Sequence, residues 1–255
     1  MKNQVKVHEV NSAVLNGRRD FLKISGVAFA GAGLMLAGCS SDDDNGMPDS
    51  NQLPGVRNGR FDLGGGDLGV LTYAYALEQL EADFYTKVVN ASGFTSTFND
   101  IEQQVLTDLY RHEVIHREFF KAAITGALTS AGEDVNARLL PNLAFDYGAL
   151  NFNSRDQVLA TSKALEDTGV AAYNGAGYII TNPDYLVIAG KIVSVEARHA
   201  SAIRSLINPN SKDFAGDDVI STTTGLDQAR KPSVIIGEVV SLDIIQTEFT
   251  AMYLP

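Results

Sequence analysis

The stretches Glu113-Val114-Ile115-His116 and Glu196-Ala197-Arg198-His199 share the form Glu-x-x-His, and both interrupt apolar patterns of helical spacing. Residues three apart lie on one face of a helix, so each pair can direct a carboxylate and an imidazole toward one point. A chain of 255 residues with 11 glutamates and 4 histidines would contain roughly 0.2 such pairs by chance. Oxygen ligands with imidazole suit iron or manganese, and zinc is also possible. The two pairs therefore indicate a metal site.

Four long helices are predicted from the spacing of apolar residues. A capping box at Asn99-Asp100-Ile101-Glu102 marks the start of the second helix, and Asn182-Pro183 marks the start of the fourth. Residues 129–153 are long enough to cross the length of a bundle, whereas the other two connections are short. The sequence thus predicts an all-α four-helix bundle with a long crossover between its second and third helices. The predicted helices cover about residues 67–90, 99–128, 154–178 and 183–208.

Each predicted helix carries a glutamate within its apolar stripe. Burying one ionised carboxylate without a partner costs several kcal/mol, and two divalent cations would neutralise four of them. The chain also repeats internally, because a tyrosine follows the glutamate by seven residues in both the first and the third helix. Each half then continues with Glu-x-x-His on its next helix, so two hairpins related by a pseudo-twofold axis would form a symmetric two-metal site. The residues are Glu78, Tyr85, Glu113 and His116 in the first half, and Glu166, Tyr173, Glu196 and His199 in the second.

This constellation resembles the ferritin-like di-metal carboxylate family over about residues 67–208, and its surroundings look like an exported branch whose members include desiccation-related proteins. The resemblance implies a ferritin-like fold with two iron or manganese ions. It implies Glu78 and Glu166 as single carboxylate ligands, Glu113 and Glu196 as bridging carboxylates, and His116 and His199 as one imidazole for each metal. The resemblance also implies a redox enzyme that acts on oxygen or peroxide: a ferroxidase, a peroxidase or a catalase-like protein. The alternative is a metal-binding or stress-protective protein without turnover.

Two assignments around these ligands stay open. Glu81 competes with Glu78 for the ligand position on the first helix, although the tyrosine at the matching distance favours Glu78. Tyr85 and Tyr173 are either ordinary core aromatics or hydrogen-bond donors to the ligand carboxylates.

His112-Glu113-Val114-Ile115-His116 also matches the His-Glu-x-x-His motif of zinc metalloproteases. The extended form of that motif, with a third histidine, is absent. A protease would also leave Glu196-x-x-His199 unexplained. We therefore expect His112 beside the metal site or at the surface.

The N-terminal residues resemble an export and anchoring signal. Arg18-Arg19-Asp20-Phe21-Leu22-Lys23 is similar to the twin-arginine motif, and Leu36-Ala37-Gly38-Cys39 is similar to a lipoprotein box. In such a signal, residues 1–38 are removed and Cys39 is lipidated. Residues 40–66, rich in Ser, Asp, Asn and Gly, predict a flexible acidic linker. We therefore expect an exported protein of the cell envelope or periplasm, held to a membrane through Cys39.

The composition of the chain excludes some classes of binding partner. The formal charge of −11 argues against a nucleic-acid partner, which needs clustered Lys and Arg. A single cysteine excludes a disulfide framework within the chain. Residues 209–255, punctuated by Pro, Gly, Ser and Thr, predict an irregular tail that packs on the bundle. The expected partners are a small oxidant and a membrane, and a homo-oligomer is compatible with the sequence.

Overall fold

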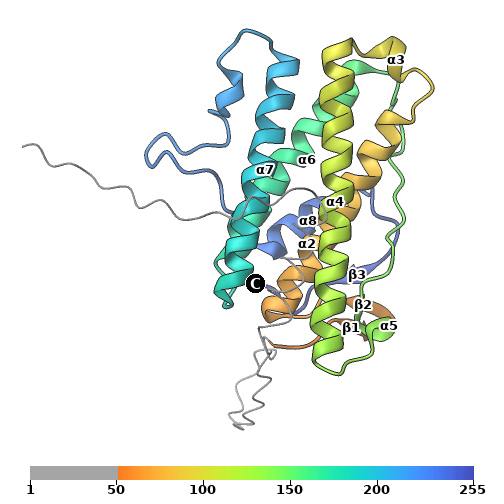
Figure 1. Cartoon of the computed structure of the whole chain (residues 1–255), viewed down its shortest axis with the longest axis vertical. Coiled ribbons are helices and arrows are strands. Elements are labelled where there is room, and N and C mark those ends of the chain that lie inside the picture. The colour runs from red at the N-terminus through yellow and green to blue at the C-terminus, as the bar shows by residue number, and fades with distance from the viewer. Residues whose placement is uncertain (1–50) are drawn as a thin grey trace, which may run out of the picture.

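The computed structural model describes residues 51–255 and contains a bundle of four long helices (Figure 1). α2 (Gly66–Val89) packs along α4 (Asp100–Ser130), and α6 (Arg155–Gly177) packs along α7 (Pro183–Ile207). The prediction of an all-α bundle is confirmed, and each helix boundary lies within two residues of the expected one. The proposed signal in residues 1–39, with Cys39, and the first part of the predicted linker lie outside the described residues.

Side-chain caps mark the residues at which α4 and α7 begin. The side-chain oxygen of Asn99 accepts a hydrogen bond from the Glu102 amide at 3.1 Å, and Glu102 Oε2 accepts one from the Asn99 amide at 3.0 Å. Asn182 caps α7 by accepting from the Asp184 amide at 2.9 Å. The carboxylate of Asp67 accepts from the amides of Thr181 and Asn182 at 2.7 and 2.9 Å, which joins the start of α2 to the start of α7.

The connection between the two hairpins runs along α2. The short helices α3 (Phe94–Thr97) and α5 (Val135–Arg138) lie before α4 and after it. Beyond α5, the Leu143 amide donates to Gln79 Oε1 at 2.8 Å, and the Tyr147 hydroxyl donates to the Leu80 carbonyl at 3.2 Å. These bonds hold the crossover against the helix that carries Glu78.

The prediction of a flexible linker as far as residue 66 is wrong for its last part. β1 (Gly55–Arg57) pairs antiparallel with β2 (Arg60–Asp62), and β2 pairs parallel with β3 (Phe249–Thr250). Leu63 is fully buried, and the buried Asp62 carboxylate accepts from the Thr250 hydroxyl at 2.7 Å and the Met252 amide at 3.0 Å. The composition of this segment does not reveal its strands, because the contacts that bury Asp62 lie almost 200 residues further along the chain.

The C-terminal residues cover the bundle. The 3₁₀ turn η1 (Asp213–Ala215) follows α7, and α8 (Pro232–Ser241) buries Ile235 and Val239. The Arg230 amide donates to the Ala171 carbonyl at 3.0 Å, so the chain before α8 lies directly on α6. Within residues 51–255, no helix combines the length and the apolar character needed to cross a bilayer.

Candidate metal centre

Six side chains meet inside the bundle, and they are the six that the sequence singled out. They form two overlapping groups in which the ligand atoms all lie within 4.8 Å of one another. Glu113 and Glu196 belong to both groups, whereas each of the other four residues belongs to one. Every helix of the bundle contributes, as the pseudo-twofold repeat predicts. The groups are Glu78, Glu113, His116 and Glu196, and then Glu113, Glu166, Glu196 and His199.

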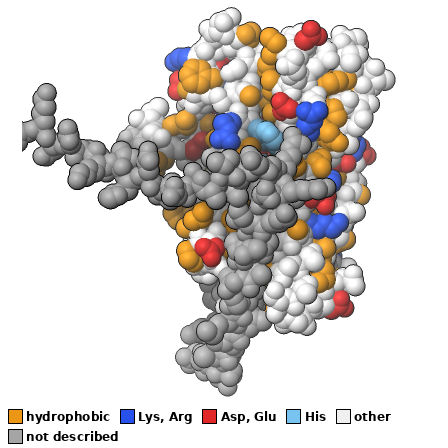
Figure 2. Space-filling view, viewed as in Figure 1, with side chains coloured by type: hydrophobic (Ala, Val, Ile, Leu, Met, Phe, Trp, Pro, Cys, Tyr) orange, Lys and Arg blue, Asp and Glu red, His pale blue; other side chains and the backbone are white. Residues whose placement is uncertain are grey.

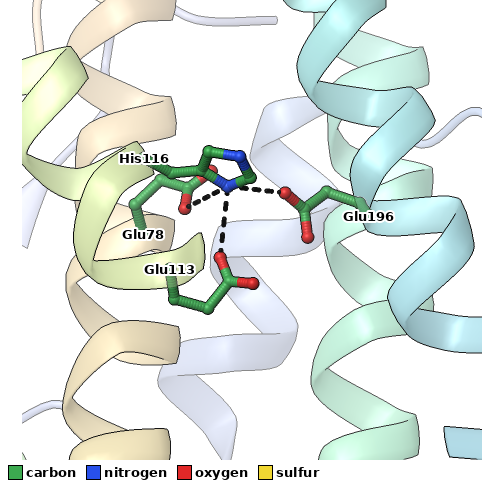
Figure 3. A group of neighbouring side chains, drawn as sticks. All are labelled: Glu78, Glu113, His116 and Glu196. Carbon is green, nitrogen blue, oxygen red and sulfur yellow. Dashed lines mark hydrogen bonds and ion pairs between the residues drawn. The ribbon is translucent and has the colours of Figure 1, made fainter. Parts of the chain in front are cut away.

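In the first group, the carboxylates surround the imidazole of His116 (Figure 3). His116 Nδ1 lies 3.4 Å from Glu78 Oε2, 3.3 Å from Glu113 Oε2 and 2.9 Å from Glu196 Oε1. The three glutamates come from three different helices, and their side chains are 0% exposed.

The second group repeats this arrangement around His199. Its Nδ1 lies 2.8 Å from Glu113 Oε1, 3.4 Å from Glu166 Oε2 and 3.1 Å from Glu196 Oε2. Glu113 and Glu196 thus direct one oxygen toward each histidine.

Four carboxylate oxygens in these groups are buried without a hydrogen bond. Each lies 2.8–3.4 Å from a histidine Nδ1, but outside hydrogen-bond geometry. Buried polar atoms normally have hydrogen-bond partners, so unpaired oxygens that converge on a nitrogen fit metal coordination. They are Glu78 Oε2, Glu113 Oε1, Glu166 Oε2 and Glu196 Oε1.

Two buried tyrosines donate hydrogen bonds to the Oε1 atoms of Glu78 and Glu166, and each tyrosine binds the glutamate of the other hairpin. Tyr85 of the first hairpin donates its hydroxyl proton to Glu166 Oε1 of the second at 2.5 Å. Tyr173 of the second hairpin donates to Glu78 Oε1 of the first. These bonds leave the other oxygen of each carboxylate directed toward a histidine. The structure therefore assigns both tyrosines the hydrogen-bonding role.

Burial and neighbouring charges shift the pKa values of the clustered side chains in opposite directions. Burial, reinforced by the Glu196 charge, raises the pKa of Glu113 to about 8. Burial acts in the same direction on Glu196, but the nearby His116 and His199 outweigh it and lower its pKa to about 2. Burial would lower the pKa of each histidine, yet the surrounding carboxylates raise both pKa values well above the usual 6.5. Without metal, protons thus supply the positive charge that the carboxylates need.

Glu81 is buried but belongs to neither ligand group. Its Oε2 has no hydrogen-bond partner, and burial raises its pKa well above the usual value. A Cβ atom built on Gly169 of α6 would lie 3.0 Å from Glu81 Oε1. Gly169 follows Glu166 by three residues, as Glu81 follows Glu78. Glu81 therefore packs against Gly169, which is its counterpart in the other half of the repeat and has no side chain.

His112 and His116 have different environments in the structure. His112 is exposed and belongs to neither ligand group, and its Nδ1 lies 2.9 Å from His199 Nε2. The interpretation as a zinc metalloprotease would require His112 and His116 to bind one ion, whereas only His116 belongs to a ligand group. Burial, followed by the nearby His199 and His116, lowers the pKa of His112.

These features define a class of protein: a four-helix bundle with a buried glutamate–histidine cluster that is compatible with a di-metal site. The family model described as ferritin-like domain matches residues 66–209, which is more than half of the chain. The chain therefore belongs to the ferritin-like domain family. A comparison with curated proteins found no match.

Alanine at position 78 is expected to halve the metal content, whereas alanine at position 81 should leave it unchanged. Glu78 directs Oε2 into the first ligand group, while Glu81 lies outside both groups. Both glutamates are buried on α2, so Glu81→Ala is a matched control for the loss of a buried side chain. Metal analysis of the two purified variants measures the difference. Loss of metal from Glu81→Ala alone would instead make Glu81 the ligand of this helix.

The metal-free protein is expected to lose stability as the pH rises from about 4.5 to about 8. Folding raises the pKa of Glu113 from 4.5 to about 8, and it raises those of His116 and His199 above 6.5. The stability that these groups contribute is complete below their unfolded pKa values, and it disappears as the pH passes through the folded values. Glu196 acts oppositely, but its pKa of about 2 places its loss in acid, as the pH falls below 4.5.

Melting temperatures in a chelating buffer across this pH range test the expectation. Glu113→Gln should show a weaker dependence, because it lacks one of the titrating groups. A melting temperature that rises with pH in the chelator would contradict the prediction. With manganese present, the decline should disappear, because metal replaces the protons and binds better at higher pH.

Proposed function

We propose that this protein binds two divalent iron or manganese ions and uses them for redox chemistry with oxygen or peroxide. The observation that carries the proposal is the set of four buried carboxylate oxygens that converge on two histidine nitrogens without hydrogen bonds. Four carboxylates and two imidazoles supply a hard ligand set whose charge matches two divalent cations. Zinc could bind the same ligands, but it could not serve the proposed reaction because it has no redox chemistry.

The chain would hold the two ions with distinct groups. Glu78 with His116 would serve one ion, and Glu166 with His199 the other, while Glu113 and Glu196 would bridge them. The hydroxyls of Tyr85 and Tyr173 orient the outer carboxylates. Burial of all four glutamates keeps the centre largely dry. Bound iron or manganese would carry electrons from ferrous iron to oxygen, from an external reductant to peroxide, or from one peroxide molecule to another in catalase-like disproportionation.

The proposed location is the cell envelope or periplasm, with Cys39 as the lipid anchor. The support is the twin-arginine-like stretch from Arg18 to Lys23 and the lipoprotein-like stretch from Leu36 to Cys39. A di-metal centre placed there would protect the envelope against oxidative stress, a role that also suits the desiccation-related branch that the sequence resembles.

Consumption of the oxidant tests the function directly. The full chain would be prepared with iron and, separately, with manganese, and oxygen and peroxide would be followed with electrodes. Consumption above that of free metal, and its absence from Glu113→Ala/Glu196→Ala, would support the redox enzyme. Two bound metals without any consumption would overturn it.

A metal-binding protein without turnover is the second candidate. The burial of the centre favours it, because only His116 among the six side chains is more than slightly exposed, at 12%. The same electrode experiment separates the two, since storage or stabilisation requires binding alone. One zinc ion retained by Glu196→Ala would instead support the metalloprotease interpretation, in which Glu196 has no part.

A further inference from the structure

His112 connects the buried centre to the surface between α4 and α7. It is the exposed member of the described histidines, and Figure 2 shows a histidine side chain at the surface of this face. Its ring lies nearly parallel to the ring of His199, with the centroids 5.1 Å apart and the planes 12° apart. His112 Nδ1 lies 2.9 Å from His199 Nε2, on the side of the His199 ring that faces away from the carboxylates.

The direction of this hydrogen bond follows from what the centre requires. His199 presents Nδ1 to Glu113, Glu166 and Glu196, so a metal ion there would take the Nδ1 lone pair. The ring proton of His199 must then be on Nε2, where it is donated to His112 Nδ1. A hydrogen bond of this kind fixes the tautomer and the orientation of a metal-binding imidazole.

The half of the centre around His116 has no corresponding hydrogen bond with a neighbouring histidine among the described residues. Among the described residues, His116 contacts the glutamates of the centre through Nδ1, and no histidine takes the place that His112 takes beside His199. The repeat shows why: position 195 precedes Glu196 as His112 precedes Glu113, and it is valine. A valine side chain has no hydrogen-bonding atom to offer an imidazole.

We propose that His112 is a positioning residue that makes the two halves of the centre unequal, so that the His199 half binds the first metal ion and binds it more tightly. This inference rests on the proposed metal centre. It also gives the first histidine of His112-Glu113-x-x-His116 a role that needs no protease.

The test measures manganese affinity in two backgrounds that each keep one half of the centre. In His116→Ala, which keeps the His199 half, His112→Phe should weaken manganese binding about 10–100-fold. In His199→Ala, the same substitution should change the affinity by less than about twofold. His112→Asn should restore binding, because an amide oxygen can occupy the position of Nδ1 and accept the same hydrogen bond. Arg111→Phe, one residue away on the exposed side of α4, controls for a bulky ring on this helix.

Cadmium NMR of the otherwise unchanged protein provides a second readout that does not depend on the half-site variants. Two resonances are expected, and His112→Phe should shift or broaden one of them. Equal weakening in both backgrounds, no weakening in either, or movement of both resonances would overturn the proposal for His112 alone. A wild-type chain that binds no metal would overturn the centre itself, so the two failures are distinguishable.

Discussion

The full chain prepared with iron or manganese is expected to hold two metal ions, and Glu113→Ala/Glu196→Ala is expected to hold none. These two carboxylates belong to both ligand groups, so their removal takes two oxygens from each metal position. Elemental analysis after removal of free metal measures the stoichiometry. The wild-type protein should also gain about 2.7 kcal/mol of stability for each bound ion at a free metal concentration of 100 times the dissociation constant, and the variant should gain nothing.

Glu118→Ala/Asp184→Ala is the matched control, because it removes one exposed carboxylate from each of the same two helices. This control should retain both metals, since neither residue belongs to a ligand group among the described residues. If Glu113→Ala/Glu196→Ala retained two metals, the buried carboxylates would need another explanation.

The second large effect is expected at Gly175, where alanine should destabilise the protein by more than about 4 kcal/mol. A Cβ atom at this position would lie 1.8 Å from the Arg230 carbonyl oxygen and 2.4 Å from its carbon. These are backbone atoms of the segment that bonds to the Ala171 carbonyl, so no side-chain rotation can relieve the clash. The segment before α8 would have to leave α6. Thermal or urea unfolding measures the loss.

Gly190→Ala is the control for this substitution. Gly190 is also helical, on α7, and a Cβ atom there would meet nothing within 4 Å. Alanine is favoured over glycine within a helix by about 1 kcal/mol, so this variant should be slightly more stable than the wild type. Equal melting temperatures for the two variants would contradict the close approach of Arg230 to α6.

The helices and the six clustered residues were predictable from the sequence because both depend on spacing within single helices. A glutamate in an apolar stripe and a histidine three residues later identify themselves without knowledge of the neighbouring helix. The internal repeat then paired the two halves. The preference for Glu78 over Glu81 also came from a spacing, because Tyr85 follows Glu78 by seven residues as Tyr173 follows Glu166.

Contacts that depend on how one helix meets another were not predictable in this way. The hydrogen bond between His112 and His199 and the approach of Glu81 to Gly169 need the relative positions of two helices, which no pattern within either helix contains. The strands at residues 55–62 were missed for a similar reason. Their burial relies on Asp62 and on distant C-terminal residues, and an isolated aspartate in a polar stretch looks like an exposed one.

The crosswise bonds of Tyr85 and Tyr173 have a consequence for how the hairpins find their alignment. Sliding one hairpin past the other by a single helical turn, about 5.4 Å, would separate each tyrosine from its carboxylate and divide both ligand groups. Apolar stripes alone tolerate such a slip, because one buried leucine resembles another. The polar side chains at the centre of this bundle therefore select one register from several that the apolar residues would accept.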